Sequence, residues 1–153
     1  MNSGFAAVIE RVSRHLRQLA PQPAPAIRVL IVDDEEPVRN FVARVVGGAG
    51  FEIVSASGPA EALALASTQS FDLLLTDLMM PDMYGDELAR RLRVDNSNLR
   101  VLYLTGFSDL LFAQQLVLSD AEAFLDKPCT VKGLMEAVML AASGRIDRDR
   151  CHG

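Results

Sequence analysis

From residue 27 onward, short apolar runs alternate with longer segments of helical spacing, and this alternation leaves the chain few possible folds. We expect strands at 28–32, 51–55, 71–76, 101–104 and 122–125, and helices at 36–48, 59–68, 86–93, 108–118 and 130–143. The runs are apolar without interruption, which is typical of strands buried on both faces. Strands that alternate with helices form a parallel sheet with helices on both faces. The sequence therefore predicts an α/β fold with a doubly wound, five-stranded parallel sheet.

The segments before and after the repeating part, 27–143, do not show the alternation of strands and helices. Residues 1–20 predict an amphipathic helix, with arginines mostly opposite an apolar stripe. The stripe consists of Phe5, Val8, Ile9, Val12, Leu16 and Leu19. Three prolines at alternate positions then predict an extended linker at 21–26. We expect Gly144 to lie just past the last helix and the charged tail, 144–153, to be disordered.

Composition excludes some classes of partner. The 153 residues suggest a single folded domain, and half of them are hydrophobic. A formal net charge of −5 argues against nucleic acid as the main partner, because phosphate binding needs a basic surface. No apolar run reaches the ~18 residues that a membrane span needs. Cys129 and Cys151 fit no metal-binding spacing, and we interpret them as reduced thiols of a cytoplasmic protein.

Polar residues follow four of the five expected strands. The first strand ends at Asp33 and Asp34, the third at Asp77, the fourth at Thr105 and the fifth at Lys127. Right-handed crossovers place the carboxyl ends of parallel strands at one edge of the sheet, where ligands bind in open α/β folds. A single aspartate after a strand is most often a turn or cap residue. The joint pattern is what predicts a site.

The residue types at this edge suit one chemistry. Three neighbouring carboxylates repel one another and need a cation, and oxygen ligands of this kind suit Mg²⁺. A hydroxyl and an ammonium opposite the metal would hold an anion between them. A metal, a carboxylate nucleophile, a hydroxyl and a lysine together predict phosphoryl transfer, in which positioning and charge neutralisation do most of the work.

Residues 27–143 resemble the receiver domain of two-component response regulators. The resemblance rests on 32–35, on Asp77 with Met80-Pro81 and Gly85, on Thr105-Gly106 and on Lys127-Pro128. It implies a flavodoxin-like sheet with strand order 2-1-3-4-5. It also implies that the chain works in a phosphorelay, as a switch and not as an enzyme that turns over other substrates.

The resemblance also implies a role for each matching residue. Asp77 would accept a phosphoryl group from a histidine kinase or a histidine phosphotransfer protein. Mg²⁺ would be bound by Asp34, Asp77 and the backbone carbonyl of Met79, with Asp33 acting through water. Thr105 and Lys127 would hold the phosphoryl group, and Thr105 and Phe124 would form the switch. The bond before Pro128 would be cis.

Two surfaces are candidates for partner binding. The helix at 108–118 is unusually apolar, and with the last helix and fifth strand it would form an output face. The apolar residues expected there are Leu110, Leu111, Phe112, Met135 and Met139. The helix at 1–20 is marginal in isolation. It would pair with a second copy in a homodimer, or dock on another protein or on the receiver body.

Two alternatives to a stand-alone receiver stay open. Ten residues after 143 are too few for a DNA-binding domain, and Met1 followed directly by a helix favours a stand-alone chain. The first alternative is the C-terminal receiver portion of a hybrid histidine kinase, in which the helix and linker at 1–26 would be a remnant of upstream sequence. A phosphatase with an aspartyl nucleophile would need a second carboxylate close after Asp77, and Asp82 is the candidate for it.

Overall fold

Five parallel strands form the centre of the computed structural model, which describes residues 3–19, 26–106 and 121–150. The strands are β1 (Arg28–Val32), β2 (Glu52–Ala56), β3 (Leu73–Asp77), β4 (Arg100–Thr105) and β5 (Glu122–Asp126). Their order in the sheet is β2-β1-β3-β4-β5, and every neighbouring pair is parallel. The strand order that the sequence resemblance implied is confirmed.

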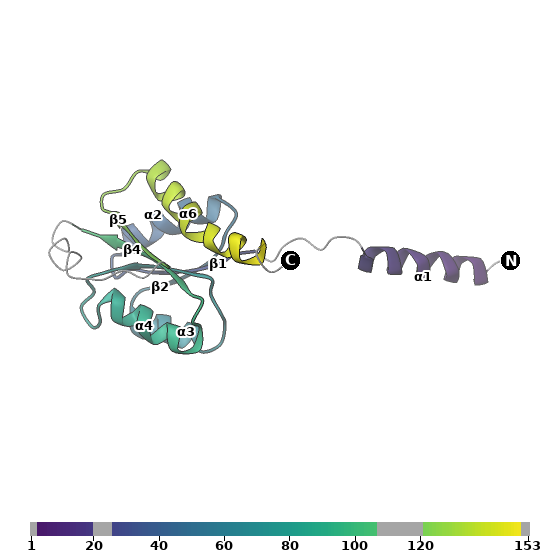
Figure 1. The fold of residues 1–153 in the computed structure, drawn as a ribbon, viewed down its shortest axis with the longest axis horizontal. Coiled ribbons are helices and arrows are strands. Elements are labelled where there is room, and N and C mark those ends of the chain that lie inside the picture. Colours follow the sequence, from purple (N-terminus) through teal and green to yellow (C-terminus); the bar gives the residue numbers. More distant parts are fainter. Residues whose placement is uncertain (1–2, 20–25, 107–120, 151–153) are drawn as a thin grey trace.

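Helices cover both faces of this sheet (Figure 1). They are α2 (Glu36–Gly48), α3 (Pro59–Ala66), α4 (Gly85–Asp95) and α6 (Val131–Arg150). In Figure 1, α2 and α6 lie on one face while α3 and α4 lie on the other. The helix expected at 108–118, with Leu110, Leu111 and Phe112, lies outside the described residues.

The sheet separates two hydrophobic cores, and each strand contributes alternate residues to them. On one face Leu30, Leu74 and Tyr103 pack with residues of α3 and α4. On the other face Ile31 and Leu75 pack with residues of α2 and α6. All five residues of β3 are buried, which agrees with the uninterrupted apolar run that predicted this strand.

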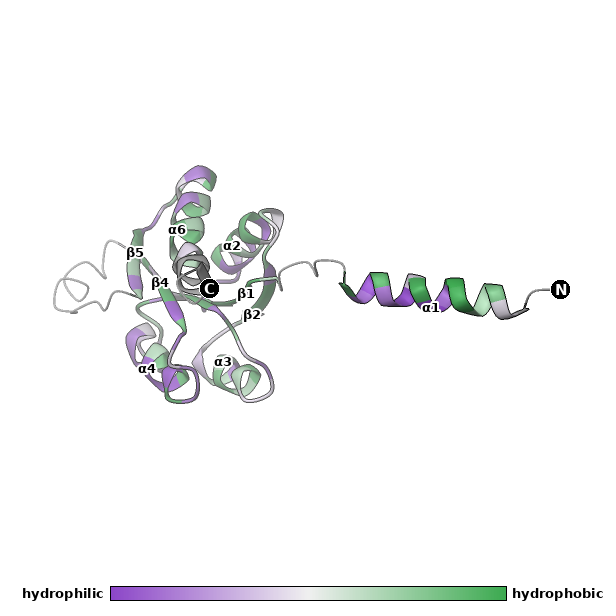
Figure 2. Cartoon of the chain, turned by 45° about the vertical axis from the view of Figure 1, so that its right-hand side comes forward, coloured by the Kyte–Doolittle hydropathy of each residue, from purple (hydrophilic) through white to green (hydrophobic). Residues whose placement is uncertain are grey.

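The helix α1 (Ser3–Leu19) stands outside these layers, and it is strongly amphipathic (Figure 2). The six apolar residues of its stripe are exposed, with fractional exposures from 51% for Ile9 and Val12 to 68% for Phe5. In the described part of the chain, no helix is long and apolar enough to cross a bilayer.

Helix ends differ from expectation at α6. This helix continues to Arg150, so the prediction that it would end before Gly144 is wrong, and 144–150 are helical. A glycine inside a helix costs about 1 kcal/mol and does not end it unless the backbone turns left-handed there. By contrast, α2 ends at Gly48 as expected, and the left-handed residue is Gly50, with φ of 93°.

Gly85 lets the start of α4 approach the end of β3. A Cβ atom at this position would lie 2.3 Å from the carbonyl oxygen of Asp77 and 3.1 Å from Cγ2 of Thr76. The amide of Gly85 also donates to the carbonyl of Leu78 at 2.8 Å. In the sequence, Gly85 stands out only as part of a motif, whereas the structure gives it a packing role beside Asp77.

Gly85→Ala should therefore destabilise the fold by about 1–3 kcal/mol, the usual cost of overpacking a filled site. Denaturant unfolding measures the effect. Gly48→Ala is the matched control, because a Cβ there meets nothing within 4 Å. Equal stability of the two variants would contradict the close approach.

Candidate functional site

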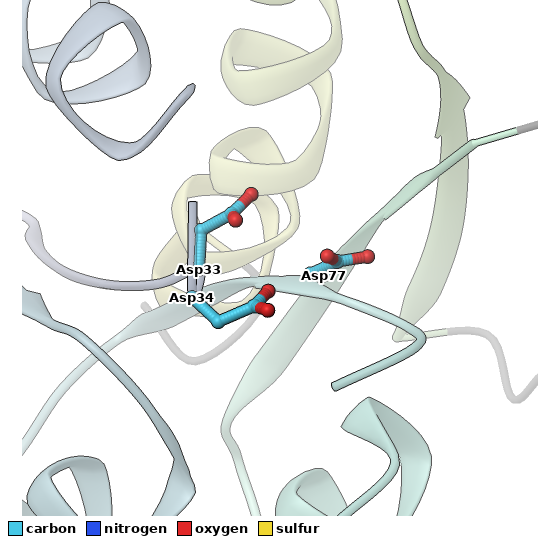
Figure 3. Close-up of side chains that lie close together, drawn as sticks. All are labelled: Asp33, Asp34 and Asp77. Atoms are coloured by element: carbon cyan, nitrogen blue, oxygen red, sulfur yellow. The ribbon is translucent and has the colours of Figure 1, made fainter. Parts of the chain in front are cut away.

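Three carboxylates meet at the carboxyl edge of the two central strands (Figure 3). Asp33 and Asp34 directly follow β1, and Asp77 is the last residue of the neighbouring strand β3. One carboxylate oxygen from each lies within 4.8 Å of the others. Asp33 and Asp77 are buried, with 0% and 5% exposure, while Asp34 is exposed. The edge predicted from the sequence is thus a compact acidic site.

The ammonium group of Lys127 lies between the two buried carboxylates. Its Nζ is 3.1 Å from Oδ2 of Asp33 and 3.3 Å from Oδ2 of Asp77. The Lys127–Pro128 peptide bond is cis, the form that the resemblance implied. The backbone amide of Lys127 donates to the carbonyl of Thr105 at 2.7 Å, which ties the end of β5 to the end of β4. Residues from three strands are thereby joined around Asp77.

Burial and charge together set the acidity of this site. The pKa of Asp77 rises to about 6, because burial outweighs the opposing attraction of Lys127, and Asp33 adds repulsion. Burial alone would lower the pKa of Lys127, but the carboxylates of Asp33 and Asp77 raise it above its ordinary value. Near neutral pH the lysine is charged and Asp77 is mostly ionised.

Local hydrogen bonds orient the two buried carboxylates. The amide of Glu35 donates to Oδ1 of Asp33 at 2.8 Å, and the amide of Met79 donates to Oδ1 of Asp77 at 3.3 Å. A guanidinium nitrogen of Arg39 donates to the backbone carbonyl of Asp33 at 2.8 Å. The other oxygen of each of these two carboxylates, Oδ2, contacts the ammonium of Lys127. The metal-binding role of the Met79 carbonyl stays a prediction.

The site fits a hard divalent cation. Three carboxylates and one ammonium leave two net negative charges, and the grouped donor atoms are all oxygens. Mg²⁺ favours such oxygen ligands and keeps several waters, which the exposed side of Asp34 would admit.

Thr105 and Phe124 lie on the α3/α4 side of β4 and β5. Thr105 is 1% exposed, and its hydroxyl donates to Oδ1 of Asp126 at 3.0 Å. The half-buried Phe124 ring packs on Tyr103, with centroids 5.3 Å apart and a tilt of 41°. The Tyr103 hydroxyl donates to Glu122 at 3.0 Å.

Sequence reasoning did not single out Tyr103, Glu122 or Asp126 as neighbours of the switch residues. The parallel register pairs Tyr103 with Phe124 and Thr105 with Asp126. Tyr103 and Glu122 lie within strands that were expected from their apolar residues, and Asp126 has the position of an ordinary aspartate at a strand end. Only the register of two strands far apart in the sequence could have found the pairs.

A family model for the response regulator receiver domain matches residues 29–139. The chain belongs to the response regulator receiver domain family. The response regulator receiver protein CpdR of Brucella abortus is 30% identical over 118 residues, which cover 75% of this chain and 98% of CpdR. The transcriptional regulatory protein FixJ of Rhizobium meliloti is 36% identical, and the match covers 78% of this chain but 61% of FixJ.

Solved receiver structures have the same fold. The receiver domain of the hybrid histidine kinase CckA superposes with a TM-score of 0.64 at 29% identity, covering 75% of this chain and 98% of that one. The Vibrio cholerae chemotaxis protein CheY4 gives a TM-score of 0.65 at 27% identity, covering 76% and 99%. This receiver therefore resembles both separate proteins and a domain of a hybrid kinase.

Mg²⁺ should raise the melting temperature of this receiver, because a ligand that binds only the folded state stabilises it. The gain should shrink as the pH falls through about 6, where a proton on Asp77 competes with the metal. Asp34→Ala should remove most of the gain and should stabilise the metal-free protein by removing repulsion. Scanning calorimetry in EDTA and in millimolar Mg²⁺ measures both effects.

Asp82→Ala is the matched control, since Asp82 is an exposed aspartate in the loop after Asp77. Its response to Mg²⁺ should equal that of the wild type. Identical melting of the wild type with EDTA and with Mg²⁺ would contradict the metal site.

Proposed function

We propose that this receiver relays a signal by carrying a phosphoryl group on Asp77. One observation supports the proposal most: Asp77 is a buried carboxylate that faces two other carboxylates and the ammonium of Lys127 at one sheet edge. The donor would be a phosphohistidine of a histidine kinase or a histidine phosphotransfer protein.

The transfer would form one bond and break one. An Asp77 carboxylate oxygen would bond to phosphorus while the bond from phosphorus to the histidine nitrogen breaks. Mg²⁺ held by Asp34, Asp77 and the Met79 carbonyl, with Asp33 acting through water, would neutralise charge on the phosphoryl oxygens. Lys127 is already 3.3 Å from Asp77 and would add a second positive charge, and the Thr105 hydroxyl would donate to a phosphoryl oxygen.

Treatment with acetyl phosphate or with beryllofluoride, each with Mg²⁺, should add one phosphoryl-type group to the wild type. Intact-mass measurement should show the acetyl phosphate adduct, and peptide mapping should place it on Asp77. Asp77→Asn should remove the adduct, and Asp82→Asn should retain it.

An Asp77→Asn variant that is still labelled would contradict the assignment. Steady hydrolysis of a generic phosphoester that Asp82→Asn abolishes would instead indicate the phosphatase. The proposal includes no such turnover, and it places the protein in the cytoplasm, where a free thiol such as Cys129 is usual.

The output partner is proposed to bind on the outer face of α6. Four apolar side chains of this helix are exposed: Val131 (51%), Met135 (37%), Met139 (54%) and Leu140 (73%). They follow one another at helical spacing, and contiguous apolar patches on soluble domains mark interaction surfaces. Phosphorylation would reach this face through Thr105 and Phe124, because β5 precedes α6 directly in the chain.

Beryllofluoride should change amide hydrogen exchange in β5 and in 131–140 of the wild type. Thr105→Ala and Phe124→Ala should still bind beryllofluoride but should lose the change in α6. Exchange mass spectrometry measures both. An unchanged α6 in the wild type, or an equal change in all three proteins, would contradict this route.

We also propose that α1 pairs with α1 of a second copy. Phe5, Ile9, Val12, Leu16 and Leu19 follow the alternating spacing of four and three residues that forms a coiled-coil seam. Charged residues are absent from the positions beside this seam, which are occupied by Ala6, Val8, Ser13 and His15. A short helix of this kind is marginal alone, so pairing would stabilise it.

Light scattering should give a mass of twice 16.6 kDa for the wild type. Ile9→Asp with Leu16→Asp should give a monomer, because both charges would be buried in the seam. Ser13→Asp with Gln18→Asp adds the same charge outside the seam and should leave the dimer intact. A monomeric wild type, or a dimer that survives the seam variant, would contradict the pairing.

A further inference from the structure

The hydroxyl of Thr105 already has a hydrogen-bond partner in this structure. Thr105 and Asp126 are opposite each other in the register of β4 and β5, and Oγ1 lies 3.0 Å from Oδ1 of the aspartate. The Lys127 amide, bonded to the Thr105 carbonyl at 2.7 Å, fixes the two strand ends together. Thr105 is 1% exposed, whereas Asp126 is exposed. The contact thus joins a buried hydroxyl to a hydrated carboxylate.

A hydroxyl has a single proton to donate. In the proposed function Thr105 donates this proton to a phosphoryl oxygen on Asp77. The same proton cannot be donated to Asp126 at the same time. A carboxylate also cannot replace the lost bond by donating one of its own, since it is an acceptor only. The phosphoryl group and Asp126 therefore compete for Thr105.

We propose that Asp126 is a positioning residue that holds the Thr105 hydroxyl away from the acidic site until a phosphoryl group displaces it. The proposal rests on the proposed function of Asp77 and deepens it by naming what opposes the switch. The strength of one hydrogen bond then sets how readily this receiver enters its phosphorylated conformation.

The exposure of Asp126 explains how its hydrogen bond with Thr105 can be broken. Water can hydrate the carboxylate as soon as the threonine hydroxyl leaves, so the net strength of the bond is modest. The dianionic phosphoryl group attracts the same proton, and in the buried site water replaces this hydrogen bond less readily than it does at Asp126. The bond is therefore strong enough to bias Thr105 and weak enough to be broken by phosphorylation.

The neighbouring pair of residues connects this bond to the aromatic switch. Phe124 lies two residues before Asp126 on the same face of β5, and its ring packs on Tyr103 opposite it. Tyr103 is itself anchored by its hydrogen bond to Glu122, which also accepts a hydrogen bond from Arg93 at 2.6 Å. Among these contacts of the described residues, the Thr105–Asp126 bond is the one that phosphorylation would break.

The test measures the affinity of the full chain for beryllofluoride in the presence of Mg²⁺, by isothermal titration calorimetry. Asp126→Ala should bind about threefold to tenfold more tightly than the wild type, since a net hydrogen bond of ordinary strength no longer has to be broken. Asp126→Asn keeps an acceptor oxygen without the charge, and its affinity should lie between the two.

A double-variant cycle separates this role from a general effect of charge. In a Thr105→Ala background there is no hydroxyl to hold, so adding Asp126→Ala should change the affinity by less than about 1.5-fold. Asp82→Ala removes another exposed carboxylate and should also leave the affinity unchanged. An equal gain in beryllofluoride affinity with and without the Thr105 hydroxyl would overturn the positioning role. So would the absence of any gain in Asp126→Ala when the wild type itself binds beryllofluoride. A wild type that does not bind beryllofluoride would overturn the proposed function itself.

Discussion

The ion pairs of Lys127 with Asp33 and Asp77 are the interaction on which the site depends. Two buried carboxylates at neighbouring strand ends would repel each other strongly in a poorly solvated edge. Lys127 lies within 3.3 Å of both and offsets part of that repulsion, so the fold tolerates an acidic site inside its core. Because a single ammonium cannot neutralise three carboxylates, the site keeps the negative charge that attracts a divalent cation.

The topology of the sheet explains how residues 94 positions apart come to pair, as Asp33 and Lys127 do. Parallel strands joined by crossover helices all end at the same edge of the sheet. The strand order reverses between β1 and β3, so these two strands are neighbours in the interior of the sheet. β3 is buried along its whole length, so Asp77 cannot move into solvent. Gly85 adds to this by allowing α4 to start against the carbonyl of Asp77. The position of Asp77, the proposed phosphoacceptor, is thus set by the buried strand β3 and by the start of α4.

Much of the fold could be predicted because its signals are local. Apolar runs marked the strands, and polar residues after three of these runs marked the edge at which Asp33, Asp34, Asp77 and Lys127 meet. Helix ends were less predictable, since a glycine such as Gly144 is favoured just past a helix end but is also tolerated inside a helix. Side-chain pairs across strands were not predictable at all: whether Thr105 donates to Asp126 depends on the register of β4 and β5, which no local pattern encodes.

A receiver needs contacts that are strong where geometry must persist and weak where it must change. The Asp77 side is held by buried ion pairs and by the close approach of Gly85, and little there can relax. The Thr105 side is held by one hydrogen bond to an exposed carboxylate. A phosphoryl group arriving between these two sides would therefore displace the weaker one, so the response to phosphorylation would begin at the end of β4 and pass to Phe124 on β5. The same asymmetry would make the change reversible, because loss of the phosphoryl group would return the hydroxyl to Asp126 with no rearrangement of the acidic site.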